Sequence, residues 1–144
     1  MKALRVSLIA AVALILATSA SAETHGWGLG AGAFNGDFGV QLRKDIGLGG
    51  DISHITAQGS VFFPGKTSFR LDADYHFSFL FGKGSRFYPL GGVDFTFNSN
   101  TAKFGVNAGG GLNFMLTKKL AAFGEGKYVF GDWDGWTFVG GIYF

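Results

Sequence analysis

Apolar and polar residues alternate without interruption between Phe69 and Phe79. The odd positions are apolar or aromatic, and the even positions carry Arg70, Asp72, Asp74, His76 and Ser78. A period of two predicts a β-strand with one apolar and one polar face. A run of this length, about eleven residues, is also what a tilted strand needs to cross a bilayer.

Turn-forming residues recur about every dozen positions and divide the chain into similar runs. The predicted strands are 26–34, 38–46, 52–63, 68–81, 87–97, 102–116, 120–130 and 136–144. No stretch with the helical period separates them. An even number of antiparallel strands joined by short turns predicts an all-β fold, an eight-stranded antiparallel transmembrane β-barrel in up-and-down meander order. Pro89 interrupts the fifth strand and predicts a bulge near its start.

Alternation also assigns the two faces of each strand. Every phenylalanine except Phe34, Phe62 and Phe123 falls on the apolar face. The opposite face gathers a polar network that we place in the lumen: Arg43, Asp45, His54, Arg70, Asp72, Asp74, His76, Asp94, Lys103, Glu125 and Lys127. Since buried ions are tolerated only when they are paired and hydrogen-bonded, we expect these charges to neutralise one another.

Turn lengths predict two cross-strand neighbours within this network. The turn after the fifth strand sets Thr96 opposite Lys103 and puts Asp94 on the diagonal, which predicts an ion pair between Asp94 and Lys103. An odd loop length between the third and fourth strands sets His54 opposite His76 or Ser78.

A soluble barrel with its apolar face inward, as in a lipocalin, would show the same alternation. A soluble surface is about a quarter to a third charged, whereas this polar face consists mostly of Gly, Ser, Asn and Thr. Composition therefore favours a barrel whose apolar face meets lipid.

The N-terminus has the pattern of an export signal. Lys2 and Arg5 precede an apolar run at 6–17, and Ala20-Ser21-Ala22 forms a cleavage site. Residues 1–22 are predicted to be a cleaved signal peptide and residues 23–144 the barrel domain. Removing the two basic residues leaves 10 basic against 10 acidic side chains, so charge gives no indication of nucleic-acid binding. The chain has no cysteine and hence no disulfide.

The last third of the chain resembles the OmpA/OmpX-type family of small outer-membrane β-barrels. The resemblance rests on the glycine-rich stretch 109–114, the turn 117–119, and Glu125 and Lys127 spaced two apart before Tyr128. A final strand ending in an aromatic residue is similar to the family's assembly signal, here Trp136, Phe138, Ile142 and Phe144. Gly140 and the short loops depart from the family pattern.

This resemblance implies a monomer in outer-membrane lipid, delivered by periplasmic chaperones and inserted by the barrel-assembly machinery. We expect both termini and the turns at 82–86 and 117–119 to face the periplasm. The expected role is structural, stabilising the envelope without catalysis or a cofactor. Alternatives are a narrow channel or carrier for small polar solutes, a lipid A-modifying enzyme and an exported soluble binding barrel.

Two local patterns are candidates for chemistry. Asp72, Asp74 and His76, with His54 on the next strand, could ligate a metal, but same-face residues lie about 7 Å apart along a strand. His76-x-Ser78 is similar to the His-x-Ser of outer-membrane lipid A deacylases, yet Phe79 follows it and its side chains are predicted to face the lumen. We therefore expect neither a metal site nor an active site.

Overall fold

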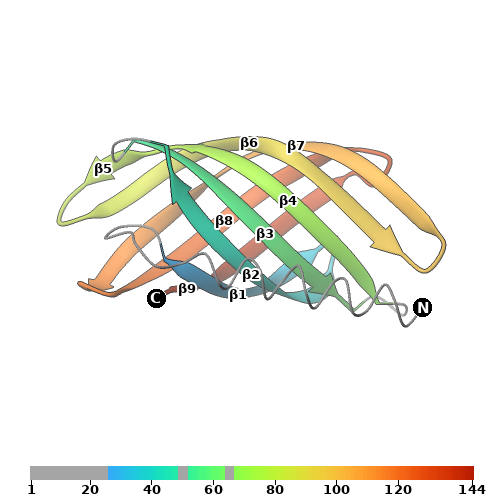
Figure 1. The fold of residues 1–144 in the computed structure, drawn as a ribbon, viewed down its shortest axis with the longest axis horizontal. Coiled ribbons are helices and arrows are strands. Elements are labelled where there is room, and N and C mark those ends of the chain that lie inside the picture. Colours follow the sequence, from blue (N-terminus) through green and yellow to red (C-terminus); the bar gives the residue numbers. More distant parts are fainter. Residues whose placement is uncertain (1–25, 49–51, 64–66) are drawn as a thin grey trace.

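The structure is a computed structural model that describes residues 26–48, 52–63 and 67–144 (Figure 1). Its strands are β1 (Trp27–Phe34), β2 (Asp37–Gly47), β3 (Ser53–Phe62), β4 (Ser68–Phe77), β5 (Phe79–Phe81), β6 (Ser85–Asn98), β7 (Thr101–Thr117), β8 (Leu120–Gly131) and β9 (Gly135–Tyr143). The predicted strand limits agree with these bounds to within two residues. The predicted signal peptide lies outside the described residues.

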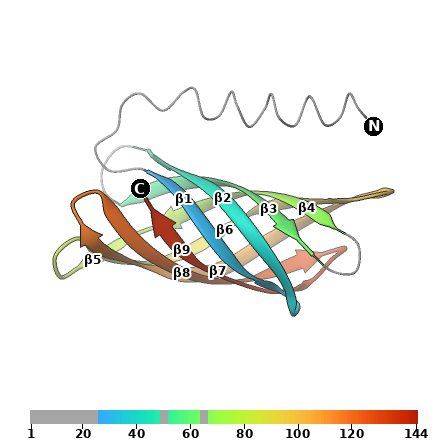
Figure 2. The same cartoon turned by 90° about the horizontal axis from the view of Figure 1, so that it is seen from below.

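The strands form one closed antiparallel barrel in meander order. Strands that follow one another in sequence pair with each other, except β4 with β5, and β1 closes the barrel by pairing with β9 (Figure 2). Both β4 and β5 pair with β6, so together they occupy one strand position in the barrel wall. We call each such strand position a stave. The barrel therefore has eight staves, as predicted. Within the described ranges, no helix is long and apolar enough to cross a membrane.

The predicted bulge at Pro89 is wrong. The pairs His76↔Leu90 and Phe79↔Phe87 lie in the same register, and Pro89 itself pairs with Gly110 in an unshifted ladder. Proline lacks the N–H that a ladder hydrogen bond needs. Pro89 on β6 therefore interrupts the partner stave between β4 and β5, but no extra residue is inserted in either strand. The register shift in this part of the barrel lies between Met115 and Thr117 instead.

The predicted faces are confirmed. Phe34, Phe62 and Phe123 are each 4% exposed inside the barrel, and the other phenylalanines are exposed on its outer surface. Outward leucine, valine, isoleucine and tryptophan side chains complete this apolar exterior. Polar side chains fill the interior, so the barrel is inside out relative to a soluble protein.

The two ends of the barrel differ. We call the end that carries the connections at 35–36, 99–100 and 132–134 the turn end. The opposite end, which we call the terminal end, carries both described chain ends, Gly26 and Phe144, and the turns at 82–84 and 118–119. At the turn end, Asn35 and Gly36 have φ values of 47° and 93°, typical of a tight hairpin turn. The Asn35 side chain also donates to the carbonyl of Asp134 at 2.9 Å and accepts from the amide of Trp136 at 3.1 Å.

Candidate functional site: the ionic network inside the barrel

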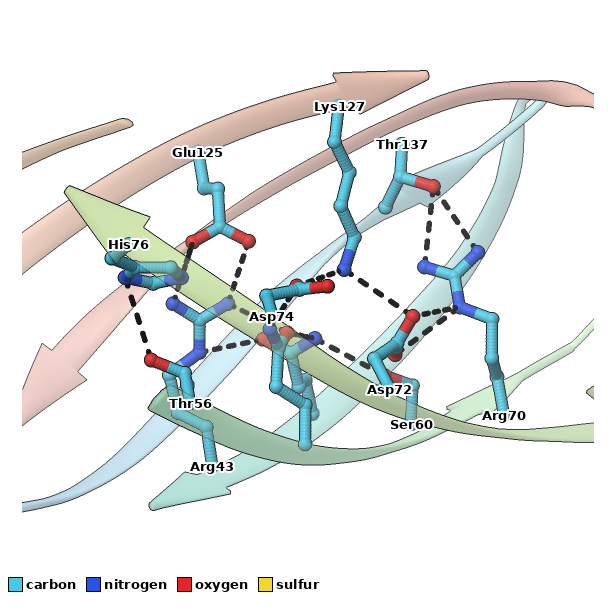
Figure 3. Close-up of polar contacts among 12 residues, drawn as sticks. Arg43, Thr56, Ser60, Arg70, Asp72, Asp74, His76, Glu125, Lys127 and Thr137 are labelled. Atoms are coloured by element: carbon cyan, nitrogen blue, oxygen red, sulfur yellow. Dashed lines mark hydrogen bonds and ion pairs between the residues drawn. The ribbon is translucent and has the colours of Figure 1, made fainter. Parts of the chain in front are cut away.

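Every residue of the predicted network except Lys103 is buried inside the barrel. β2 contributes Arg43 and Asp45, β3 contributes His54, and β4 contributes Arg70, Asp72, Asp74 and His76; Asp94 lies on β6, and Glu125 and Lys127 lie on β8. Alternation places them on one face because every second residue of a strand points inward. Figure 3 shows how side chains from opposite staves meet across the lumen.

Arg43 and Glu125 form a bidentate ion pair across the barrel. The two terminal nitrogens of Arg43 donate to the two Glu125 carboxylate oxygens at 2.9 and 3.0 Å (Figure 3). Further donations reach Gln41, Gln58 and Tyr143, so each guanidinium nitrogen has a partner. A bidentate pair between a guanidinium and a carboxylate fixes the relative orientation of the two side chains and adds interaction energy.

Tyr88 and Phe123 pack around this ion pair. The Tyr88 hydroxyl donates to Glu125 Oε2 at 3.1 Å, and the Arg43 guanidinium lies 4.2 Å above the Phe123 ring centroid. Gly111 makes room for Tyr88, because a Cβ there would lie 2.5 Å from the tyrosine hydroxyl. The alternation of the sequence put Phe123 on the inner face, but it identified neither aromatic residue as a partner of the charges.

Lys127 connects two carboxylates of β4. Its Nζ lies 2.6 Å from Asp74 Oδ2 and 3.2 Å from Asp72 Oδ1 (Figure 3). The Gln58 amide also donates to Asp74 Oδ2. Lys127 is 1% exposed, so its ammonium exchanges water entirely for these protein oxygens.

Arg70 links the network to an apolar cluster at the turn end. Its Nε lies 3.2 Å from Asp72 Oδ1, and its terminal nitrogens donate to Thr137 at 3.2 Å. The guanidinium also lies about 5 Å from the ring centroids of Phe34 and Phe62. The cluster consists of Phe34, Phe62 and Val129, with Trp133 packed against it. It covers the polar network on that side.

The two histidines lie opposite each other near the terminal end, as one of the two predicted registers required. His54 lies 3.6 Å from Asp45 and contacts Arg86 at 3.0 Å, whereas His76 stacks on Tyr88 with ring centroids 4.4 Å apart. Within the described ranges, no three His, Cys, Asp or Glu side chains are grouped to hold a metal.

The His76-x-Ser78 pair does not form a nucleophile–base contact in the described residues. His76 Nδ1 faces the Thr56 hydroxyl at 3.4 Å, and both His76 and Ser78 are 4% exposed inside the barrel. A serine nucleophile needs a base within hydrogen-bond reach and access to substrate.

The predicted ion pair between Lys103 and Asp94 is wrong, although the register behind it is confirmed. Thr96 does pair with Lys103, but Lys103 Nζ bonds to the carbonyl of Asp132 at 3.3 Å and lies 5.4 Å from the Trp133 ring. Lys103 is half-buried at the turn end, where a long side chain reaches the adjacent connection more easily than the lumen.

The terminal aromatic strand lies at the closure of the barrel. Trp136, Phe138, Ile142 and Phe144 all point outward and are 42–61% exposed. The backbone of Phe144 exchanges hydrogen bonds with Trp27 at 2.8 and 3.1 Å, which completes the pairing of β1 with the chain's last residues.

No protein-family model matches the sequence, and no curated protein matches it either. Solved structures do match the fold. The N-terminal β-barrel domain of Pseudomonas aeruginosa OprF has a TM-score of 0.71 at 15% identity, over 83% of this chain and 95% of that one. A de novo designed transmembrane β-barrel gives 0.63 at 15% identity, over 85% and 96% of the two chains.

The Yersinia pestis outer membrane protein Ail has a TM-score of 0.54 at 14% identity, over 82% of this chain and 98% of that one. The OprF domain and the designed protein are described as β-barrels, and Ail is described as an outer membrane protein. By fold, the chain is therefore a closed eight-stranded antiparallel barrel similar to the OprF barrel domain and to Ail, in agreement with the resemblance in its last third.

Proposed function

We propose that this protein is an integral outer-membrane barrel that stabilises the cell envelope and performs no catalysis. The observation that carries the proposal is the inside-out arrangement, with phenylalanine outside and paired charges inside. Leaving a phenylalanine side chain in water forgoes about 2 kcal/mol of burial energy, whereas an entire domain is stable by only about 5–15 kcal/mol. An exterior of this kind requires lipid around it.

Fractionation of cells tests the location. The protein should stay in the outer membrane through washes with carbonate or high salt, and it should migrate differently on gels before and after boiling. Recovery of folded monomer from the soluble periplasm would instead support the exported soluble barrel.

Export by residues 1–22, and assembly through periplasmic chaperones and the barrel-assembly machinery, belong to the same proposal. The terminal end would face the periplasm, where Lys83, Lys118 and Lys119 lie in its turns. Because the chain has no cysteine, single substitutions Ser99→Cys and Lys118→Cys can report orientation. A membrane-impermeant maleimide applied to intact cells should label position 99 and not 118. The reverse pattern would invert the proposed orientation.

A narrow channel is the second candidate, favoured by buried polar atoms that lack a protein partner. Within the described residues these include atoms of Asp94, Asn107 and Asn113. Against conduction stand the ion pairs of Arg43 and Lys127 across the lumen and the apolar cluster at the turn end. The structural role is therefore the stronger proposal.

A further inference from the structure

Three carboxylates face two cations in the half of the lumen near Arg70 and Lys127. Asp72 contacts both cations through its oxygens, and Asp74 contacts Lys127 through Oδ2 alone. Asp94 lies directly opposite Asp72 but forms no ion pair with a cation of the described chain. This half of the interior therefore carries one negative charge in excess.

Four polar atoms beside this excess charge have no hydrogen-bond partner among the described residues: Asp74 Oδ1, Asp94 Oδ2, and Oδ1 and Nδ2 of Asn107. The three residues are only 0–4% exposed. A buried polar atom without a partner is destabilising, because it has lost its water and gained no hydrogen bond, so folded proteins rarely tolerate several together. The cost is removed if a ligand binds these atoms.

Pairing of β6 with both β4 and β7 brings the residues that carry the four atoms to one patch of the inner wall. Gly92 pairs with Asn107, and two residues along, Asp94 pairs with Gly105. Asp74 Oδ1, reaching over from β4, lies where a Cβ on Gly92 would stand, and Asp94 Oδ2 lies 2.7 Å from the corresponding point on Gly105. The glycines thus leave space that carboxylate oxygens occupy next to Asn107. Asp94 and Asn107 occupy diagonal positions of the two paired strands, which generally lie ~7–8 Å apart. One ion with its bound waters can bridge this distance.

We propose that this patch binds a monovalent alkali cation through Asp74, Asp94 and Asn107. Oxygen ligands suit hard cations. A single positive charge balances the excess carboxylate, whereas a divalent ion would leave the site positive. The Asn107 carbonyl faces the cation, and its amide nitrogen donates to water on the ion.

Urea unfolding in detergent tests the proposal, because urea is uncharged and leaves the ionic conditions unchanged. Sodium chloride is raised over roughly two decades, from about 1 to about 100 mM, while choline chloride holds the ionic strength constant. The midpoint of the natural protein should rise saturably, by about 0.5–1 M urea. Asp94→Asn, which keeps the shape of the side chain, and Asn107→Ala should abolish the sodium response. Asp132→Asn removes the same charge from an exposed turn and should keep it.

Broadening of the ²³Na NMR signal by the natural protein, reduced in Asp94→Asn, would show binding directly. An unchanged midpoint in the natural protein would mean that Asp94 is neutralised by a proton, and it would overturn the proposal. An equal sodium response in Asp94→Asn would overturn it as well. The assay uses detergent, so its result is independent of where the protein lies in the cell.

Discussion

At the scale of single residues, Arg43 shows how this barrel accommodates charge. All three of its guanidinium nitrogens donate to interior side chains, and its plane lies over Phe123. Such a pair does not necessarily add stability over an apolar core of equal volume, because both ions lose their water. Removing one partner is different, because the other charge then stays buried alone.

Glu125→Gln should therefore lower the free energy of unfolding by about 3–5 kcal/mol, since it leaves buried Arg43 without a counter-charge. Lys103→Ala is the control and should cost less than about 1 kcal/mol, because Lys103 is half-buried and its ammonium bonds to a backbone carbonyl at the turn end instead of a buried carboxylate. Urea unfolding of the two variants measures both costs. Equal losses would mean that the network does not depend on the Arg43 pair.

Substitutions at adjacent residues of one stave should lower the stability of the barrel to very different extents. Phe77 is 43% exposed on the outside, whereas Ser78 is 4% exposed inside. Phe77→Arg puts a charge against lipid and should cost up to about 2–4 kcal/mol in bilayers, depending on depth. Ser78→Ala should cost far less. If the order were reversed in lipid-vesicle unfolding experiments, the assignment of faces would be wrong by one residue.

At the scale of elements, the last strand both closes the barrel and displays an aromatic surface. Backbone bonds between Phe144 and Trp27 close the sheet, whereas the Phe144 side chain is 61% exposed and contributes little packing. In the proposed assembly route, closure and recognition are thus carried by different atoms of the same residue.

Phe144→Ala should consequently leave folding into detergent unchanged while reducing the amount assembled in cells. Gel mobility before and after boiling measures the folded fraction in both settings. Phe63→Ala is a suitable control, because Phe63 is an outward phenylalanine of similar exposure away from the last strand. A matching loss in both variants would show that lipid contact, and not recognition of the last strand, sets the yield.

At the scale of the whole molecule, ion pairs cross the lumen and an apolar cluster lies at the turn end. Arg43 and Glu125 are 82 residues apart in sequence, and Lys127 and Asp74 are 53 apart, so the network ties β8 to β2 and β4. The interior acts as a polar core that holds opposite walls together.

Purified barrels in planar bilayers should accordingly show at most small and infrequent openings. The physical reason is that opening a path requires separating buried ion pairs, each costly to break. A wide porin recorded in the same bilayers serves as the control for insertion and sensitivity. A steady, large conductance would replace the structural role with the channel.

The sequence by itself determined the strands, the two faces and the closed fold. A side-chain period of two is a local property, and it put Phe34, Phe62 and Phe123 inside and every other phenylalanine outside. Turn lengths likewise predicted that Thr96 meets Lys103, and they limited the partner of His54 to His76 or Ser78, of which the structure selects His76. The same alternation predicted which charged residues lie on the inner, polar face.

Partners across the lumen were decided only by the tertiary structure. Which distant staves face each other at a given height depends on closure and strand stagger, which no local pattern encodes. Arg43 therefore meets Glu125, and Lys103 turns to the Asp132 carbonyl instead of Asp94. Pro89 likewise breaks a stave without a bulge, because the paired strands on both sides hold the register across the missing hydrogen bond.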